Sequence, residues 1–420
     1  MSGGRRVLVL SPFPPRLDGR HGGSRAVAQL VCALAERCRV ALAYLRAADE
    51  PPADPATARA CERLFEGRRP GVSASSLRPW TRAPAVLPRL AAGKPLWVAA
   101  RWDAAFARGV RALAREWRPQ VVQAEFTAMA QYLGAVEDRG ALRVVTVHEP
   151  GVPAARERVL AATGWERAFW RGDARRWERY EGEVVDAADA AVVFTERDRA
   201  AVERPGTRTP VVRIPLAVPV PERAADPLGA DPPELLFVGS FVHPPNLDAA
   251  LYLARDLFPR LRARVPGLRL ALVGDDPPER LRALAGAGLE VAGWVPDLAP
   301  RLDRAALVVA PLRRGGGMRV KTAEALAAGK AVLGSPLAFE GLDVVPGTHA
   351  ALATGGDDFV AAASRLLADP ERRARMARAA RAWALANLGP DRTAAAYEAV
   401  YDGLAERQCE SAKVRECESA

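Results

Sequence analysis

The sequence predicts an α/β fold in which two doubly wound domains each contain a mostly parallel sheet. Three observations lead to this prediction. Short apolar runs alternate with longer amphipathic segments, as in successive strand–helix–strand units. Seven prolines between positions 210 and 233 mark a linker near the middle of the 420 residues. A glycine-rich loop separates an apolar run from a helix in each half, and such loops can bind anions at the helix N-terminus.

The composition is that of a soluble globular enzyme, with 49% hydrophobic and 26% charged residues. No run approaches the roughly 18 apolar residues of a membrane span. The first apolar run is too short for a signal-peptide core. The five cysteines form no CxxC pair, so we expect neither a zinc site nor a disulfide framework. These features predict a cytoplasmic protein.

The net charge of +10 is unevenly distributed. Residues 1–217 contain 35 Lys and Arg against 24 Asp and Glu, whereas residues 218–420 contain 25 against 26. The basic half could meet nucleic acid, anionic lipid or an acidic substrate. Zinc-finger spacing, an RNP-like run and a basic-region zipper are all absent from the sequence, so no nucleic-acid partner is expected.

The first domain opens with a strand at residues 6–10 and a loop that ends in Gly22 and Gly23. A helix is expected at 24–37, with Ser24 at an N-cap-like position. This arrangement could bring backbone N–H groups to an anion, although a Gly-Gly pair more often only forms a turn. A second strand is expected at 39–45.

Residues 50–101 look irregular and rich in Pro, Arg and Ala. Trp80 and Trp97 lie among arginines there, which would suit an acceptor lid or a membrane-facing patch. Helices folded over a core are the simpler interpretation. A helix near 103–117 then leads to a strand at 120–124.

His148 directly follows an apolar strand at 142–147. It should therefore lie at the carboxyl edge of the sheet, where ligands bind in open α/β folds. The alternative is a loop histidine that only caps the strand.

Residues 163–187 predict one long amphipathic helix, with Trp170, Trp177 and Val184 facing the core. A basic stripe follows another face. It could be a solvated face paired with nearby glutamates, or a contact with anionic lipid or a lipid-linked pyrophosphate acceptor. The stripe consists of Arg167, Arg171, Arg175 and Arg179, and the glutamates are Glu166, Glu178 and Glu183. Strands at 190–195 and 211–214 complete the domain.

The second domain should begin with a strand at 234–239, followed by a loop in which Asn246 is expected to cap a helix. Further strands are expected at 268–274, 289–293, 306–311 and 331–334. One helix is expected to begin at Pro278, and others are expected at 320–328, 357–367, 370–388 and 392–404. Residues 407–420 contain an eight-residue repeat and are expected to be a frayed helix end.

Gly315, Gly316 and Gly317 separate the strand at 306–311 from the helix at 320–328. Arg319 and Lys321 lie at the N-terminus of this helix, where cations oppose the macrodipole, and an anionic ligand would resolve the conflict. Lys321 is one of only four lysines among 60 basic residues. A compact ammonium suits phosphate. Glu324, one turn into the helix, could accept hydrogen bonds from sugar hydroxyls.

This segment resembles the C-terminal signature of the family 4 retaining glycosyltransferases (glycosyl transferases group 1). It matches the glycine-rich form P-L-R-x-G-x-G-x-x-x-K-x-x-E-A from Pro311 to Ala325. Glu324 takes the place of the second Glu of the family's E-x7-E motif. Gly316 stands where the first Glu would be, so a sugar contact by that side chain is not expected.

The resemblance implies a GT-B fold, with two Rossmann-like domains facing each other across a central cleft. An acceptor-side domain would span 1–217, with the helix at 390–406 packing back on it, and a nucleotide-sugar domain would span 218–389, leaving 407–420 as a tail. His148, Lys321 and Glu324 would act in catalysis. The donor would also contact Gly22, Gly23, Gly239, Ser240, Asn246, Val295, Gly315, Gly316, Gly317, Met318, Arg319, Val320 and Thr322.

The implied activity is transfer of a sugar from a nucleotide sugar to an acceptor hydroxyl, with retention and without a metal. No D-x-D motif appears near these residues. A glycan, a lipid-linked molecule or a small molecule would be the acceptor, as in the synthesis of polysaccharides, glycolipids or other glycoconjugates, with peripheral binding to the inner face of the membrane. Two alternatives stay open: a nucleotide-sugar epimerase on the same fold, and a non-catalytic protein that binds nucleotide sugars.

Overall fold

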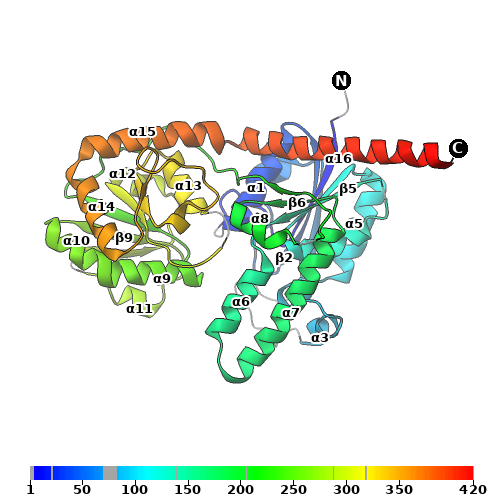
Figure 1. The fold of residues 1–420 in the computed structure, drawn as a ribbon, viewed down its shortest axis with the longest axis horizontal. Coiled ribbons are helices and arrows are strands. Elements are labelled where there is room, and N and C mark those ends of the chain that lie inside the picture. The colour runs from blue at the N-terminus through cyan, green and yellow to red at the C-terminus, as the bar shows by residue number, and fades with distance from the viewer. Residues whose placement is uncertain are drawn as a thin grey trace. The chain divides into compact units, whose positions relative to one another are not determined.

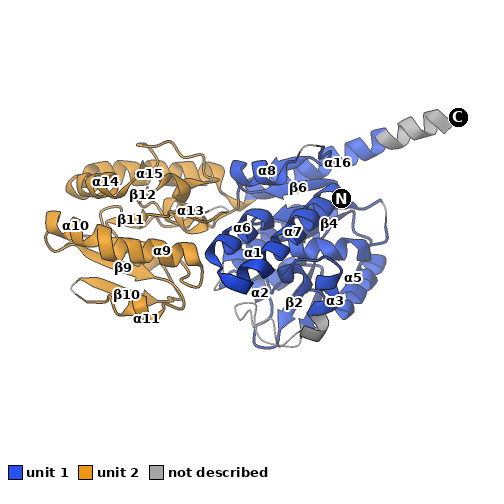
Figure 2. Ribbon diagram, turned by 60° about the horizontal axis from the view of Figure 1, so that its bottom comes forward, with its two compact units in different colours: residues 1–215, 391–420 blue, residues 216–390 orange. Residues whose placement is uncertain are grey.

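The computed structural model of the chain describes residues 4–19, 22–69, 83–138, 140–204, 206–286, 288–316 and 319–419. They form two compact units: residues 1–215 with 391–420 make unit 1, and residues 216–390 make unit 2 (Figure 2). Unit 1 contains a parallel sheet of seven strands and unit 2 a parallel sheet of six. The predicted fold class, with two doubly wound Rossmann-like sheets, is confirmed.

The sheet of unit 1 has the order β3-β2-β1-β4-β5-β6-β7, and all of its strand pairs are parallel. The chain order reverses between β1 and β4, so the carboxyl ends of these two strands flank the switch point where ligands bind in such folds. The strands are β1 (Arg6–Ser11), β2 (Arg39–Ala47), β3 (Arg63–Arg69), β4 (Val121–Glu125), β5 (Leu142–Val147), β6 (Ala190–Val193) and β7 (Val211–Arg213).

The two faces of this sheet are covered by different helices (Figure 1). Val7 and Val9 of β1 pack in one buried cluster with α1 (Gly22–Ala35) and α16 (Pro390–Ser419). Leu8 and Leu10 point to the other face, because successive side chains of a strand alternate. They pack there with α5 (Ala104–Trp117) and α7 (Gly164–Asp186). The last helix of the chain is thus part of the core of unit 1.

The remaining helices described in unit 1 are shorter. The helix α6 forms with α7 an antiparallel hairpin that projects from the sheet (Figure 1). These helices are α2 (Pro55–Ala60), α3 (Ala83–Ala91), α4 (Leu96–Ala99), α6 (Gly151–Ala161) and α8 (Glu196–Val202), with a 3₁₀ segment, η2, at Thr127–Ala135.

The expectation that residues 50–101 are irregular is wrong for the described part of that range. β3 pairs with β2 along seven residues and forms the edge of the sheet. The strand was not predicted because it contains many charged residues, which an edge strand tolerates since one of its faces can be exposed to water. Phe65, between these charges, stacks on Phe106 of α5 with ring centroids 5.6 Å apart.

Trp97 agrees with the simpler interpretation, in which helices fold over a core. It is partly buried in α4, its ring centroid lies 6.5 Å from that of Trp177, and the Arg101 guanidinium lies 3.8 Å over its ring. The alternative, in which Trp97 belongs to a membrane-facing patch, is wrong. Trp80 lies outside the described residues.

The helix α1 begins at Gly22, two residues earlier than expected. Ser24 is inside the helix and does not cap it. Its hydroxyl donates to the Pro14 carbonyl (2.7 Å) and accepts from the Arg16 amide (3.1 Å), which ties the loop after β1 to the helix.

The sheet of unit 2 has the order β10-β9-β8-β11-β12-β13 and reverses between β8 and β11. Its strands are β8 (Glu234–Val238), β9 (Arg269–Val273), β10 (Leu289–Gly293), β11 (Leu307–Ala310), β12 (Val332–Gly334) and β13 (Ala351–Leu352). Its helices are α9 (Pro244–Tyr252), α10 (Phe258–Arg264), α11 (Glu279–Arg282), α12 (Ala299–Arg304), α13 (Val320–Ala327), α14 (Gly356–Ala368) and α15 (Pro370–Asn387), with π-helical η3 at Leu253–Leu257 and 3₁₀ η4 at Pro336–Phe339.

Two helix ends test the sequence signals directly. Gly329 follows α13 with a φ of +80°, the left-handed conformation expected of a glycine that ends a helix. The helix α16 continues to Ser419, well past the predicted end at 404, so its backbone includes most of the repeated segment. Among the helices in the described residues, none is long and apolar enough to cross a membrane.

Lys330 is a buried cation in unit 2. It is fully buried, and its Nζ donates to the carbonyl of Asp226. Burial lowers its pKa to about 8, against the opposing attraction of the Asp226 and Asp303 carboxylates. Arg373 lies close enough to lower it further.

We expect this burial to make stability depend on pH. Because the folded protein releases the Lys330 proton at a lower pH than the unfolded chain does, stability should rise as pH increases from about 8 towards 10.5. Relative to Lys330→Met, the wild-type unfolding free energy should increase by on the order of 2 kcal/mol between pH 7 and 10. Urea unfolding of both proteins at several pH values measures this difference. A difference that stays constant with pH would contradict the buried cation.

Candidate functional site

In unit 2, the loops after β8 and β11 lie together at the switch point of the sheet. A Cβ built on Gly315 would be only 3.0 Å from Cγ of Pro245, at the start of α9. Arg313, in the loop after β11, makes a bidentate pair with Asp248 of α9, with distances of 3.0 and 2.8 Å. The Arg313 guanidinium also lies 4.4 Å over the ring of Tyr252. These contacts join the two predicted donor loops.

Asn246 has a different local role from the predicted one. His243 is the N-cap of α9, and Pro244 and Pro245 fill the first helical positions. Proline is favoured there because its missing N–H would have no partner. The Asn246 amide instead donates to the Ser240 carbonyl at 3.0 Å. A Cβ on Gly239 would be 2.9 Å from Cγ of Asn246, so glycine allows this close approach.

The N-terminus of α13 carries the charged residues that the sequence singled out. Lys321 Nζ is 2.9 Å from Glu324 Oε2, within the same helix. The Lys321 side chain is 34% exposed and that of Glu324 15%. Arg319 is the N-cap residue, and its Nε donates to the Leu337 carbonyl at 3.3 Å. An ammonium, a guanidinium and a carboxylate therefore gather at one helix end.

Gly315 makes room for this arrangement. It has a φ of +109°, and a Cβ there would approach Arg319 Nη1 to 3.3 Å as well as Pro245. A side chain would be strained by the backbone angle and crowded by both neighbours.

The other predicted donor residues of unit 2 are distributed around this point. Gly316 and Val320 are partly exposed, whereas Thr322 is buried within α13. Gly317 and Met318 lie outside the described residues. Val295 follows β10, and the strand order puts it two strands away from β8.

In unit 1, the two glycines and the histidine lie at the carboxyl edge of the sheet. Gly22 and Gly23 are the first residues of α1, and a Cβ on Gly22 would meet nothing within 4 Å. His148 follows β5, and its Nε2 lies 2.6 Å from Oε2 of Glu125, the last residue of β4. Their side chains are 8% and 1% exposed. The histidine is therefore held by a buried carboxylate.

Two aromatic rings fix the plane of the His148 ring. Phe126 stacks on it with centroids 3.7 Å apart and an interplanar angle of 8°. Phe194 meets it edge-on at 4.9 Å. Phe126 has a φ of +67°, a conformation that costs a non-glycine residue roughly 1–3 kcal/mol and that recurs at functional sites. The histidine is thus held in one orientation at the expense of backbone strain.

Glu125 was not predicted to belong to the site, although the sequence contains a usable signal for it. Glu125 directly follows the predicted strand at 120–124, just as His148 follows the strand at 142–147. β4 and β5 are neighbours in the sheet, so polar residues at their carboxyl ends meet. The same rule that selected His148 would have selected Glu125.

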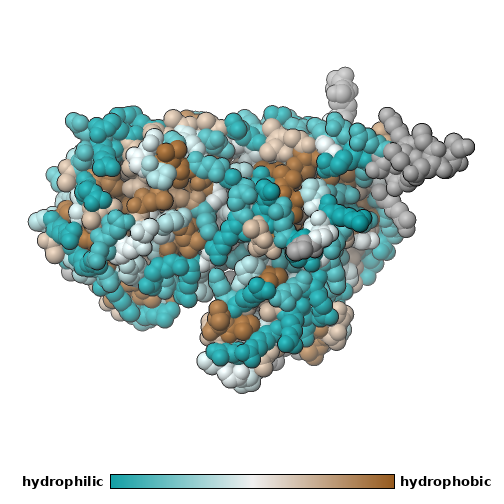
Figure 3. Space-filling view, in the orientation of Figure 1, coloured by the Kyte–Doolittle hydropathy of each residue, from teal (hydrophilic) through white to brown (hydrophobic). Residues whose placement is uncertain are grey.

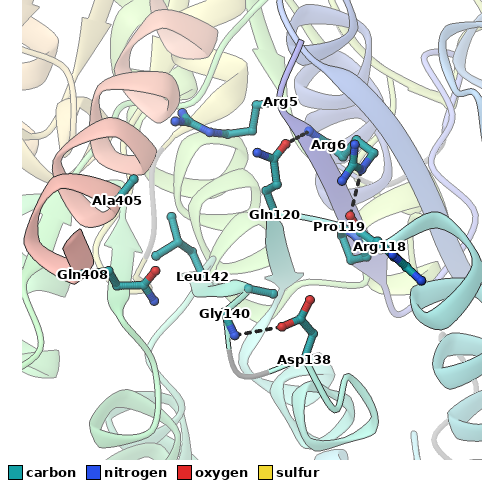
Figure 4. A pocket seen from close by; sticks show the side chains of 11 residues that line it. Arg5, Arg6, Arg118, Pro119, Gln120, Asp138, Gly140, Leu142, Ala405 and Gln408 are labelled. Carbon is teal, nitrogen blue, oxygen red and sulfur yellow. Dashed lines mark hydrogen bonds between the residues drawn. The ribbon is translucent and has the colours of Figure 1, made fainter. Parts of the chain in front are cut away.

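A separate cavity of about 380 Å³ lies at the opposite, amino-terminal edge of this sheet (Figure 4). Within it, the Arg6 amide donates to Gln120 (3.0 Å) and Arg6 Nε donates to the Arg118 carbonyl (2.8 Å). It contains none of the residues predicted for the site. Among the described residues, no cluster of three or more His, Cys, Asp or Glu side chains could hold a metal ion.

Comparisons with known proteins agree with this architecture. Residues 232–369, which include the loops around β8, β11 and α13, match the family model described as glycosyl transferases group 1. No curated protein sequence matches the chain significantly.

Solved structures of similar fold span nearly the whole chain. Sucrose-phosphate synthase from Thermosynechococcus elongatus is 19% identical, with a TM-score of 0.68, and the match covers 97% of this chain and 100% of that one. HepE from Anabaena, solved with UDP and glucose, is 12% identical with a TM-score of 0.63, covering 96% and 99%. A glycosyltransferase from Rickettsia africae is 9% identical with a TM-score of 0.60, covering 95% and 98%. Residues 232–369 therefore belong to the glycosyl transferases group 1 family, and the chain as a whole has the GT-B fold of these structures.

Proposed function

We propose that unit 2 binds the nucleotide sugar at the switch point between β8 and β11, and that the enzyme transfers the sugar to an acceptor hydroxyl with retention of configuration. The observation that carries this proposal is the convergence of both loops on the N-terminus of α13. There Arg319, Lys321 and the helix end supply positive charge, and Glu324 supplies a hydrogen-bond acceptor. Departure of a nucleoside diphosphate requires stabilisation of the negative charge that develops on it.

The remaining predicted residues have roles in the same proposal. The loop around Gly239, Ser240 and Asn246 would approach the phosphates, and backbone groups near Val295 would contact the nucleobase. In unit 1, His148 would bind a hydroxyl of the transferred sugar, with Gly22 and Gly23 giving the donor access to backbone N–H groups. HepE was solved with UDP-glucose, which supports a UDP-sugar as the first donor to test.

The acceptor is proposed to be a glycan, a lipid-linked molecule or a small molecule, which places the enzyme in the synthesis of polysaccharides, glycolipids or other glycoconjugates. TarM, which shares the fold, was solved with UDP and α-GlcNAc-glycerol, a glycosylated molecule. We propose a cytoplasmic enzyme that binds peripherally to the inner face of the membrane.

Thermal unfolding in the presence of a panel of nucleotide sugars tests donor binding. A ligand at 100 times its Kd stabilises the folded state by about 2.7 kcal/mol, which gives a clear shift in Tm. We expect one nucleotide sugar, and its free nucleoside diphosphate, to raise the Tm of the wild type. The shift should be lost in Lys321→Ala. No shift with any nucleotide sugar or nucleoside diphosphate would contradict donor binding.

Transfer should need no metal ion, because Lys321 and Arg319 can neutralise the leaving diphosphate. We therefore expect full activity after treatment with EDTA. The control is a second sample to which Mg²⁺ or Mn²⁺ is returned in excess, which should change the rate by less than about twofold. Activity that disappears with EDTA and returns with either metal would overturn this proposal.

The surface of unit 1 supports a membrane contact at the predicted basic stripe of α7, but the apolar side chains come from a different place than predicted. The tip of the α6–α7 hairpin exposes Leu160 (81%) and Trp165 (69%). Figure 3 shows hydrophobic surface among hydrophilic atoms on this hairpin. The basic stripe Arg167, Arg171, Arg175 and Arg179 runs along the exposed side of α7. Of the glutamates expected to pair with it, Glu178 pairs with Arg156 and Glu183 with Lys94.

We expect the protein to bind anionic vesicles at low salt through this hairpin, since basic residues gain about 1 kcal/mol each near anionic lipid. Replacing Leu160 and Trp165 together by serine should reduce co-sedimentation by about tenfold or more. Leu385→Ser, at an exposed leucine of unit 2, is the matched control and should leave binding unchanged. Equal and negligible binding of the wild type to neutral and anionic vesicles would show that the stripe serves only as a solvated face.

A further inference from the structure

Behind His148, a buried chain of polar side chains runs from Glu125 to the last helix of the protein. Glu125 Oε1 accepts hydrogen bonds from Gln123 Nε2 (2.5 Å) and from Thr146 Oγ1 (2.8 Å). Its other oxygen, Oε2, meets His148 Nε2. Gln123 Oε1 in turn accepts from the hydroxyl of Tyr401, on α16. Gln123 and Tyr401 are completely buried.

This geometry determines which nitrogen of His148 carries the proton. Two donors at Glu125 Oε1 stabilise a charged carboxylate, because hydrogen bonds to the charged form favour it. A charged carboxylate has no proton to give, so the short contact at Oε2 requires a proton on His148 Nε2. Nδ1 of the neutral ring is then the acceptor, with its lone pair directed away from Glu125.

Tyr401 fixes the orientation of the Gln123 amide. Its hydroxyl donates to Oε1, so the NH₂ group of Gln123 must point to Glu125. Without the tyrosine hydroxyl, a buried carbonyl oxygen would lose its partner, and the amide could turn to place Oε1 against the carboxylate. The Tyr401 hydroxyl on α16 therefore sets the direction of the hydrogen bonds in this network.

We propose that Glu125 is a positioning residue for His148, and that Tyr401 of the C-terminal helix completes the same device, so that the histidine presents Nδ1 as a hydrogen-bond acceptor to a sugar hydroxyl. The last step rests on the proposed function, whereas the tautomer itself does not. The returning helix thus contributes to the site through Tyr401, which lies 278 positions after Gln123 in sequence.

The substitution Glu125→Gln should invert this arrangement. The amide oxygen would keep the place of Oε1 and accept from Gln123 and Thr146, which turns the amide NH₂ towards His148. Nε2 would then have to accept, and the proton would move to Nδ1. In other histidine–carboxylate pairs, an amide in place of the carboxylate traps the wrong tautomer and costs up to about 10⁴ in rate.

Nitrogen-15 NMR of the histidine rings reads the tautomer directly and without any substrate. The chain has only four histidines, and the His148 signals are assigned by their loss in His148→Asn. At pH 8 we expect protonated Nε2 in the wild type and protonated Nδ1 in Glu125→Gln. The inference is overturned if the His148 nitrogen shifts are the same in both proteins, or if the wild type carries its proton on Nδ1.

The two tyrosines of α16 provide a matched pair for the remote part of the proposal. Tyr397 lies one turn before Tyr401 and is equally buried, but its hydroxyl has only a long contact of 3.4 Å with Thr146. Tyr401→Phe should broaden or shift the His148 signals and lower kcat/KM about two- to tenfold, whereas Tyr397→Phe should change both much less. Equal effects of the two substitutions would contradict a specific role for Tyr401.

Activity measurements then separate this inference from the proposed function. If Glu125 positions a transfer residue, Glu125→Gln should lower kcat/KM by between about 10²- and 10⁴-fold while circular dichroism shows an intact fold. Wild-type protein that fails to transfer any sugar but shows the predicted tautomers would contradict the proposed function alone. A normal rate in Glu125→Gln with an inverted tautomer would overturn the positioning role.

Discussion

Replacing Lys321 by alanine is expected to lower turnover by about 10²-fold or more. Lys321 is at the second position of α13, where a cation opposes the helix dipole, and binding of an anionic ligand there would offset this cost. The loss of one such electrostatic contact in a transition state typically costs 10²–10³ in rate. Steady-state kinetics, with the donor that thermal unfolding identifies, measure the turnover of Lys321→Ala relative to the wild type.

The matched control for this substitution is Arg314→Ala. Arg314 is a cation of the loop before α13, but its guanidinium lies 3.7 Å from Asp248, in the middle of α9. It should keep nearly wild-type turnover, which would separate a local phosphate contact from a general loss of positive charge. Near-normal turnover in a folded Lys321→Ala protein would show that the diphosphate is stabilised elsewhere.

The substitution Glu324→Gln should also have a large effect, a loss of roughly 10- to 100-fold in kcat/KM. The carboxylate holds the Lys321 ammonium at 2.9 Å, and in the proposed function it would also accept strong hydrogen bonds from sugar hydroxyls; an amide would perform both tasks poorly. We expect KM for the donor to rise and kcat to fall, with the Tm nearly unchanged because the pair is partly exposed.

A double-mutant cycle distinguishes these two tasks. If Glu324 acts partly by placing Lys321, the combined loss in Lys321→Ala/Glu324→Gln should be smaller than the product of the single losses, since contacting residues are not additive. Strictly multiplicative losses would mean that the two side chains act independently. Unchanged donor affinity and rate in Glu324→Gln would remove it from the site altogether.

The parts of the fold that local sequence signals determine were predictable. The unit from β11 to β12 combines an apolar run, three glycines, a helix and a terminating glycine, and each signal acts within a few residues. The conformation of Gly329 and the limits of α13 agree with expectation to within one residue. Unit 2 therefore brings together Lys321 and Glu324 much as the sequence implied.

Competing local signals account for the errors at helix starts. Asn246 is a favoured capping residue, but Pro244 and Pro245 precede it, and a proline in the first turn sets the start of α9 earlier. Similarly, Ser24 was preferred as a cap over the two glycines before it, although its hydroxyl is needed to bind the loop at Pro14. Neighbouring prolines therefore decided the start of α9, and a hydrogen bond to the preceding loop decided the role of Ser24.

The network behind His148 could not be predicted from one sequence, because it depends on contacts between distant segments. Gln123 and Tyr401 are 278 positions apart in sequence. They meet because α16 packs on the same face of the sheet as α1. The stacking of Phe126 on His148 likewise depends on the positive φ of Phe126, which cannot be predicted from the residue type. The only local sequence signal for this network was the position of Glu125, a polar residue at the end of a strand.

The most direct test of the account follows a nucleotide sugar and an acceptor by proton NMR in the presence of EDTA. We expect nucleoside diphosphate and glycosylated acceptor to appear in equal amounts, the anomeric coupling of the product to match that of the donor, and Lys321→Ala and Glu125→Gln to slow both signals together. A free monosaccharide or its epimer formed without any acceptor, or a product with inverted anomeric configuration, would contradict it.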